Sequence, residues 1–332
     1  MSTPSPTDIS RAAELLDELR QQVAKAVVGQ RDAVDQCLIA LVACGHVLIE
    51  GVPGLGKTLL ARSLAKAMTL NYARVQFTPD LMPSDITGHS VLDTSSRVDG
   101  SGAPSLRVQK GPVFTNLLLA DEINRAPAKT QSALLEVMQE YQVTLEGQTL
   151  TLPRPFMVIA TQNPIDTEGT YPLPEAQLDR FLFKIDVGYP TQDEETTIVR
   201  RTTEQLSGDQ LPLDAVTARL TDRHVLSLQK LASMIRADDK VIDYAVRIMR
   251  ATRNWPGLSS GAGPRAAIAL VRAARATALL QGRDYVTPDD IKAHALPVLR
   301  HRVMLAPDAQ LEGRSVDDLL QGVLADVGAP RL

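Results

Sequence analysis

The sequence predicts an α/β fold in which a parallel five-stranded sheet with β-hairpin insertions is followed by a smaller all-α domain. Short, continuously apolar runs alternate with helical patterns over the first 189 residues, which is typical of parallel strands covered on both faces. After residue 189 the strand pattern ends and helical spacing continues. The 332 residues carry a net charge of −4, and 44 % are hydrophobic and 22 % charged, as in an average globular protein.

The elements are taken in chain order after residues 1–7, which we expect to be a flexible tail. Apolar residues recur every four positions from Leu15 to Val27, which predicts a helix that begins at Asp8 and stops at Gly29. The other elements predicted before residue 189 are a helix at 31–43 and five strands at 46–49, 74–77, 117–120, 156–160 and 181–187.

Two stretches, 89–112 and 141–152, interrupt this alternation. Each contains two short extended runs around a turn signal, which is Asp99-Gly100-Ser101-Gly102 in the first and Glu146-Gly147 in the second. Both stretches are therefore predicted to be β-hairpins inserted into the parallel-sheet pattern.

A boundary near residue 189 divides the prediction into an α/β domain at 8–189 and an all-helical domain at 190–332. In the second domain, Pro264 occupies the first position of a helix that runs to about Gln281. Another helix start is Thr287-Pro288-Asp289-Asp290, which combines a capping threonine, a proline and two carboxylates.

A glycine-rich loop at 51–58 matches the pattern G-x-x-x-x-G-K-[ST]. The glycines allow backbone N–H groups to turn inward and close on phosphate oxygens. Lys57 would reach the β- and γ-phosphates, and the Thr58 hydroxyl would ligate Mg²⁺. The loop follows an apolar strand and opens a helix, which is the setting in which a helix N-terminus binds phosphate. The sequence therefore predicts a P-loop.

Polar residues end two of the predicted strands. Asp121 and Glu122 follow strand 117–120, where a carboxylate points into the ligand crevice of a parallel sheet. Asp121 would hold Mg²⁺, and Glu122 would act as general base on an attacking water, which favours hydrolysis over phosphoryl transfer to a substrate. Asn163 follows strand 156–160 and could contact the γ-phosphate and orient the water.

Two arginines have both a surface and a catalytic interpretation. Arg180 precedes the last predicted strand, and Arg265 opens a helix of the second domain. As an arginine finger, Arg180 would reach the γ-phosphate of a neighbouring subunit and stabilise transition-state charge. Arg265 could touch the same phosphate from the helical domain.

In this order, the motifs resemble those of the AAA+ ATPases, and within them the MoxR group of the helix-two-insert branch. The resemblance covers most of 25–190 and one stretch of the helical domain. It is carried by Val28-Gly29-Gln30, His46 to Thr58, Val75 to Asp80, Lys110 to Val113, Leu118 to Arg125, Ala160 to Pro164, Tyr171 to Phe181 and Gly261 to Ala266.

The resemblance implies a core sheet of order 5-1-4-3-2, a helical lid and a ring, usually a hexamer, with ATP at each subunit interface. It assigns Glu122, Asn163, Arg180 and Arg265 as catalytic residues, with Arg180 acting in trans, and Thr58 and Asp121 as Mg²⁺ ligands. The implied nucleotide contacts are Val28, Gly29, Gly51, Val52, Pro53, Gly54, Leu55, Gly56, Lys57, Thr58, Leu59 and Asp121.

The resemblance also implies a chaperone-like ATPase that works with a partner carrying a von Willebrand factor A domain and matures a client protein, including metal or cofactor insertion. Alternatives in the same branch are a nucleic-acid motor and the motor subunit of a metal chelatase; a nucleotide-dependent switch is a further one. A nucleic-acid motor would need a basic channel, but the predicted hairpins carry only Arg97, Arg107 and Lys110.

Several function classes are disfavoured. The N-terminal residues lack the basic start and apolar stretch of a signal peptide, and the longest apolar stretch, 37–49, is too short to span a bilayer. We therefore expect a cytoplasmic protein. The five histidines have no ligand spacing, and an Asn-Lys-x-Asp guanine signature is absent. ATP and Mg²⁺ are the expected cofactors.

Overall fold

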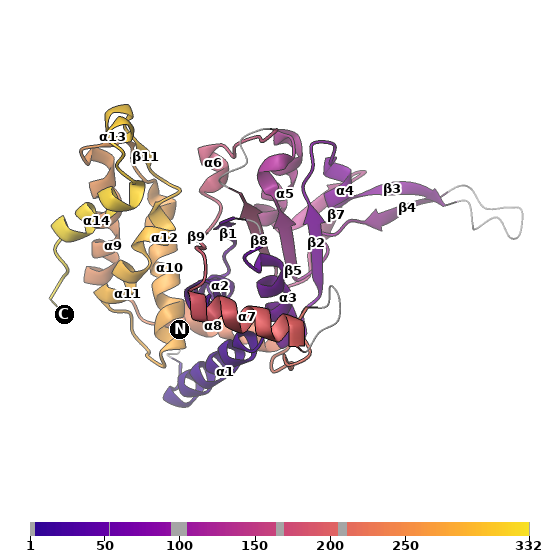
Figure 1. Cartoon of the computed structure of the whole chain (residues 1–332), viewed down its shortest axis with the longest axis horizontal. Coiled ribbons are helices and arrows are strands. Elements are labelled where there is room, and N and C mark those ends of the chain that lie inside the picture. The colour runs from indigo at the N-terminus through magenta and orange to yellow at the C-terminus, as the bar shows by residue number, and fades with distance from the viewer. Residues whose placement is uncertain (1–3, 53, 94–104, 164–168, 205–210, 332) are drawn as a thin grey trace, which may run out of the picture.

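The computed structural model describes residues 4–52, 54–93, 105–163, 169–204 and 211–331. A central sheet is covered by helices on both faces, a helical bundle lies beside it, and a two-stranded ribbon projects from the opposite side (Figure 1).

Five parallel strands form the central sheet in the order β2-β5-β8-β1-β9. Read from the other edge, this is the order 5-1-4-3-2 that the resemblance implies, so the predicted fold class is confirmed. The strands are β1 (Val47–Glu50), β2 (Tyr72–Gln76), β5 (Leu117–Asp121), β8 (Met157–Gln162) and β9 (Phe183–Asp186).

Alternate residues of the central strands enter two different cores. Leu117 and Leu119 of β5 pack into a core that also contains residues of the helical bundle. Leu118 and Ala120 pack into the second core, on the other face. This period of two, with apolar residues on both faces, explains why the strand reads as a continuous apolar run.

The first core is covered by α1 (Pro6–Ala24), α2 (Arg31–Val42) and α3 (Lys57–Ala67), and the second by α4 (Pro83–Thr87) and α5 (Ala128–Glu140). Helix α1 begins two residues earlier than predicted. The Ser5 hydroxyl caps it by accepting a hydrogen bond from the Asp8 backbone N–H at 3.1 Å.

Both predicted hairpins are confirmed. Strands β3 (Gly88–Asp93) and β4 (Ser105–Lys110) form the projecting antiparallel ribbon in Figure 1, and β6 (Gln142–Leu145) pairs with β7 (Gln148–Thr151). In the second hairpin, Glu146 and Gly147 have φ values of 46° and 78°, which two-residue hairpin turns require. The turn predicted at 99–102 lies outside the described residues.

The helical part differs from the sequence prediction in one respect. Residues 190–332 were expected to be helical throughout, but β10 (Leu258–Ser260) pairs antiparallel with β11 (Met304–Leu305). These strands have three and two residues, too few to show a period in the sequence.

The short helix α6 (Glu175–Leu178) precedes β9. The later helices are α7 (Gln192–Glu204), α8 (Asp222–Met234), α9 (Asp239–Ala251), α10 (Pro264–Leu280), α11 (Pro288–Ala293), α12 (Ala295–Leu299), α13 (Pro307–Leu311) and α14 (Val316–Asp326).

The alanine-rich helix α10 is the centre of the bundle. Its small buried side chains, such as Ala269 and Ala273, allow α1, α2, α8 and α9 to pack closely around it. One hydrophobic core contains residues of both the sheet and this bundle, so the packing does not mark a division between two domains. The domain boundary near residue 189 therefore stays a prediction. Within the described ranges, no helix is both long and apolar enough to cross a lipid bilayer.

Candidate active site

The P-loop connects β1 to α3, as the sequence predicts. Gly54 and Gly56 have φ values of 87° and 71°, in the left-handed region that favours glycine. A Cβ at Gly51 would lie 2.7 Å from the Val187 carbonyl oxygen, so this position also needs glycine. The loop therefore has the backbone of a phosphate cradle at a helix N-terminus. Pro53 lies outside the described residues.

Lys57 begins α3 and bends back over the loop. Its ammonium group donates a hydrogen bond to the Gly51 carbonyl at 2.6 Å. Burial lowers the pKa of Lys57, whereas the nearby carboxylates of Asp121, Glu122 and Glu50 raise it. Three acidic groups therefore act on one half-buried ammonium beside the loop. Thr58 is the next residue and lies in the first turn of α3.

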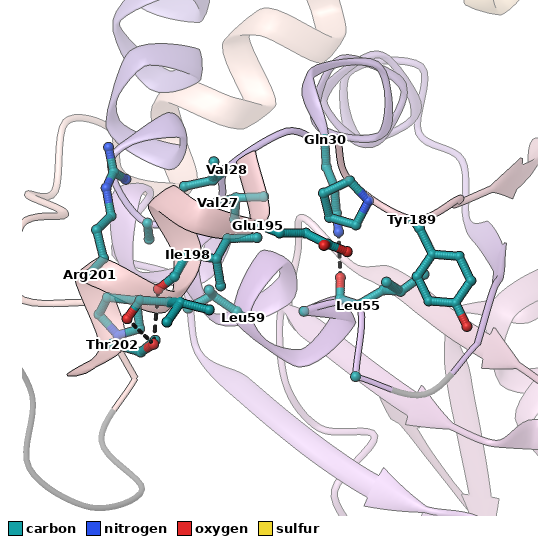
Figure 2. A pocket seen from close by; sticks show the side chains of 16 residues that line it. Val27, Val28, Gln30, Leu55, Leu59, Tyr189, Glu195, Ile198, Arg201 and Thr202 are labelled. Atoms are coloured by element: carbon teal, nitrogen blue, oxygen red, sulfur yellow. Dashed lines mark hydrogen bonds between the residues drawn. The ribbon is translucent and has the colours of Figure 1, made fainter. Parts of the chain in front are cut away.

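A cavity of about 390 Å³ lies against the outer side of the P-loop, between α7 and the segment that joins α1 to α2. Figure 2 shows apolar side chains around it from both segments, such as Val28 and Ile198, and from α3, such as Leu59. Gln30 donates a hydrogen bond to the Leu55 carbonyl and so ties this segment to the P-loop. An apolar cavity beside a phosphate cradle fits a purine base.

Gly29 and Val52 border neighbouring hollows rather than this cavity. Gly29 has a φ of 75°, and a Cβ there would lie 2.6 Å from the Glu194 carboxyl carbon of α7, so glycine permits the close approach of α7. Val52 lines a smaller hollow together with Gly51 and Tyr189.

Asp121 is the last residue of β5 and is held by two neighbouring strands. Its Oδ1 accepts a hydrogen bond from the Thr161 hydroxyl of β8 at 2.5 Å. Its Oδ2 accepts from the Arg74 guanidinium of β2 at 2.7 and 3.2 Å. The carboxylate is thus fixed at the carboxyl edge of the sheet.

Glu122 has a φ of 56°, an uncommon value for a non-glycine residue that costs about 1–3 kcal/mol. Its backbone N–H donates to the Thr161 hydroxyl at 2.9 Å. Its Oε2 accepts from the Gln76 amide at 2.7 Å and pairs with Arg125 at 3.1 Å. Such local strain is typical of functional positions, and the contact with Gln76 places the Glu122 carboxylate beside β2.

Asn163 is buried just after β8. Because β8 lies between β5 and β1, the chain places Asn163 at the same edge as the P-loop and Asp121. The structure therefore brings together four predicted elements at one edge: the P-loop, Lys57, the acidic pair and Asn163.

The donor set fits magnesium. Mg²⁺ prefers oxygen ligands, keeps several waters and usually takes one or two protein groups, which matches one hydroxyl at Thr58 and one carboxylate at Asp121. Across the described residues there is no group of three or more His, Cys, Asp or Glu side chains that could hold a metal ion.

Arg180 lies at the other end of the sheet. Two residues later, the Leu182 N–H donates to the His46 carbonyl at 2.8 Å, at the amino end of β1, whereas the P-loop follows its carboxyl end. The five residue steps from His46 to Gly51 span about 16 Å of extended chain. The Arg180 side chain donates to the Leu135 carbonyl and to the Gln139 side chain at 2.9 and 2.6 Å. It does not approach the P-loop of its own chain.

Arg265 lies beside Arg180 and not beside the P-loop. Its guanidinium is 3.6 Å from an Asp179 carboxylate oxygen. A cavity of about 350 Å³ at this amino edge is lined by Arg180, Arg265, Arg272 and Arg302, with Asp179 as the acidic residue among its lining. Arg302 is paired with Asp179, which leaves Arg180, Arg265 and Arg272 as three guanidinium groups around one hollow, a setting that suits an anion.

Sequence reasoning did not assign roles to Arg74, Gln76, Thr161 or Gln30, which contact the site residues directly. A usable signal was present for Arg74 and Gln76. They are two positions apart on β2, so their side chains point to the same face of the sheet. Strand pairing sets Gln76 opposite Asp121.

Comparisons with known proteins agree with this geometry. Residues 46–183 match the ATPase family associated with various cellular activities (AAA), and residues 250–323 match the AAA lid domain. The chain is 44 % identical over 316 residues to the uncharacterized protein YeaC of Bacillus subtilis, covering 95 % of each chain.

It is also 44 % identical to the chaperone MoxR1 of Mycobacterium tuberculosis, covering 94 % of this chain and 81 % of that one. A crystal structure from Cytophaga hutchinsonii, described as that of a proposed ATPase, superposes with a TM-score of 0.88 at 40 % identity and covers 97 % of both chains. With an AAA+ sheet, a P-loop and an acidic pair in place, the chain belongs to the MoxR-type AAA+ ATPases and is an ATP-hydrolysing enzyme.

Proposed function

We propose that this chain hydrolyses Mg²⁺-bound ATP as a ring, usually a hexamer, in which each active site is completed by the neighbouring subunit. The observation that carries the proposal is the separation of the site into two edges. The P-loop and the acidic pair lie at the carboxyl edge of the sheet, and Arg180 and Arg265 lie at the amino edge. One chain cannot bring both edges to one phosphate, but two adjacent copies can.

At the carboxyl edge, we assign residues 51–59, and Lys57 in particular, to binding the phosphates. We assign Val28 to the base, and Gly29 to the border of the base site, in the hollow next to the cavity. Thr58 and Asp121 would hold Mg²⁺, which neutralises charge on the phosphate oxygens when it is bound. Glu122 accepts a proton from the attacking water, and Asn163 orients that water. The position of Lys57 supports this arrangement, because the carboxylates of Asp121, Glu122 and Glu50 raise its pKa and so oppose the larger lowering of the pKa by burial.

At the amino edge, Arg180 and Arg265 would stabilise the developing charge on the γ-phosphate of the neighbour. The sequence alone suggested that Arg265 reaches this phosphate from the lid. Its place beside Arg180 supports a role on the same neighbouring phosphate, in trans.

For the output of hydrolysis, we propose chaperone-like remodelling of a client protein together with a von Willebrand factor A domain partner, including metal or cofactor insertion, in the cytoplasm. The name of the mycobacterial relative, chaperone MoxR1, supports remodelling. The projecting β3–β4 ribbon offers exposed Arg107 and Lys110, and the β6–β7 hairpin carries no Lys or Arg, so these hairpins offer little basic surface for nucleic acid.

Mixed rings test the shared site. Arg180→Ala subunits keep an intact P-loop, and Lys57→Ala subunits keep an intact amino edge, so each is expected to be nearly inactive alone. A mixture contains sites built from the two intact halves and is expected to recover part of the ATPase activity, measured as phosphate release. If the mixture stays as inactive as the separate variants although the subunits co-assemble, the trans assignment is wrong.

A further inference from the structure

Arg302 is a charged residue buried between the lid and the sheet. It follows α12, and its side chain is only 3 % exposed. A buried guanidinium is tolerated when its charge is paired and its donors are satisfied. Asp179 supplies the counter-charge, because Arg302 Nε lies 2.7 Å from Asp179 Oδ1.

All five N–H donors of Arg302 have acceptors in one short segment of chain or in α12. Nη2 donates to the carbonyls of Asp179 and Phe181 at 3.1 and 2.6 Å. Nη1 donates to the Leu182 carbonyl at 3.3 Å and to the Val298 carbonyl of α12. Arginine has five donors in a fixed plane and lysine has three, so lysine cannot make the same set of contacts.

The acceptors surround Arg180. Asp179, Phe181 and Leu182 are its chain neighbours, and the segment 179–182 leads directly into β9. The preceding lid residue, His301, also contacts the Phe181 carbonyl, at 3.0 Å from its Nε2. The lid therefore holds the backbone on both sides of Arg180.

The same carboxylate reaches Arg265. Asp179 Oδ1 faces the buried Arg302, and Asp179 Oδ2 lies 3.6 Å from Arg265 Nη1. Arg265 begins α10, so Asp179 stands between two lid elements and next to Arg180 in the chain. The Asp179 carboxylate thus contacts Arg265 directly and is one residue away from Arg180, so its position affects both arginines at the amino edge.

We propose that the Asp179–Arg302 pair is a positioning device that holds Arg180 and Arg265 in the geometry required by the nucleotide of the neighbouring subunit. This inference rests on the proposed sharing of the active site between subunits. Neither residue of the pair touches the nucleotide. Their effect is confined to the amino edge, and the P-loop of the same chain keeps its own binding properties.

Two variants test the proposal. Asp179→Asn removes the charge that faces both arginines, and Arg302→Lys keeps the charge but loses two donors. Each is expected to lower kcat about tenfold to a hundredfold, the range of a misplaced catalytic group, while KM for ATP changes less than about twofold. If Asp179→Asn does not fold, Arg302→Lys still tests the proposal, because it keeps a buried cation beside Asp179.

Asp317→Asn is the matched control. Asp317 pairs at 2.7 Å with Arg300, another lid arginine two residues before Arg302, and does not contact residues 179–182. The chemical change is the same as in Asp179→Asn. Thermal unfolding and ring assembly are measured for all variants, and wild-type kcat is expected for Asp317→Asn.

Mixed rings distinguish positioning from general damage. Asp179→Asn mixed with Lys57→Ala is expected to recover ATPase activity as well as Arg180→Ala mixed with Lys57→Ala does. Asp179→Asn mixed with Arg180→Ala is expected to stay inactive, because both subunits lack a working amino edge.

Three results would overturn the proposal. They are wild-type kcat in both variants, an increase in KM for ATP equal to the loss in kcat, and no recovery with Lys57→Ala under conditions where Arg180→Ala recovers. If Arg180→Ala also fails to recover with Lys57→Ala, the shared active site itself is contradicted, and this inference falls with it.

Discussion

The Arg74 guanidinium forms an ion pair with the Asp121 carboxylate, the group that the sequence assigns to binding magnesium. Two of its nitrogens lie 2.7 and 3.2 Å from Asp121 Oδ2, and the other carboxylate oxygen accepts from Thr161. Arg74 also donates to the Gln76 side chain at 2.9 Å. A metal ion that binds Asp121 must therefore share this carboxylate with a resident cation from β2.

Arg74→Gln is expected to lower the Mg²⁺ concentration needed for half-maximal nucleotide-dependent activity. The Arg74 side chain is about half exposed, so the ion pair contributes no more than about 1 kcal/mol, or about fivefold in apparent metal affinity. Mn²⁺ binding measured by electron paramagnetic resonance, in the presence of ADP, checks this without turnover. Weaker metal binding in the variant would show that Arg74 orients Asp121 instead of competing for it.

Glu122→Gln is expected to bind ATP but to hydrolyse it at least about a hundredfold more slowly, because the amide cannot accept a proton from water. The substitution keeps the size of the side chain and one oxygen near Gln76. Nucleotide affinity is measured by equilibrium titration and turnover by phosphate release. Turnover near the wild-type rate would remove Glu122 from the proposed chemistry.

Lys57→Ala is expected to lose nucleotide binding. The ammonium is the one P-loop side chain with a formal charge, so its removal takes away the cation that faces the phosphates, and the nearby carboxylates of Asp121, Glu122 and Glu50 remain. Titration with a fluorescent ATP analogue measures the affinity. The matched control is Lys66→Ala on the same helix, which removes a partly exposed cation on its last turn and should leave affinity unchanged. Retained affinity in Lys57→Ala would contradict the phosphate cradle.

Folding stability is expected to fall in mild acid because burial lowers the pKa of three histidines, His46, His294 and His301. Burial lowers the pKa of His46 and of His294 to about 4 from 6.5, and the neutral ring of His46 accepts a hydrogen bond from the Val158 N–H at 3.0 Å. The unfolded chain takes up these protons first, so stability is full above pH 6.5 and is lost as the pH falls towards 4. Each histidine contributes up to roughly 3 kcal/mol.

Urea unfolding at pH 7 and at pH 5 measures this loss. His46→Gln is expected to make the difference between the two pH values smaller, and His89→Gln, at an exposed position on β3, is expected to leave it as in the wild type. An equal pH dependence in all three proteins would contradict the assignment to His46.

Much of the molecule could be read from local patterns. The apolar runs at 46–49, 117–120 and 156–160 became β1, β5 and β8, because a strand buried on both faces must be apolar throughout, and Glu146-Gly147 formed the predicted turn. The pair β10–β11 was missed because five residues carry no detectable period. The contacts of Arg74 with Asp121 were missed because the implied strand order makes β2 and β5 neighbours but does not give the register that sets Gln76 opposite Asp121.

The sequence by itself determined that the P-loop, Asp121, Glu122 and Asn163 lie at one edge of the sheet, since each stands at or just after the end of a strand and parallel strands end together. Only the tertiary structure decided where the arginines lie. Arg180, Arg265 and Arg302 are up to 122 residues apart, and they meet because the lid packs against the amino end of β9. The hydrophobic burial of α10 and α12 determines where the lid packs, and therefore where these arginines come together. No local motif encodes that packing.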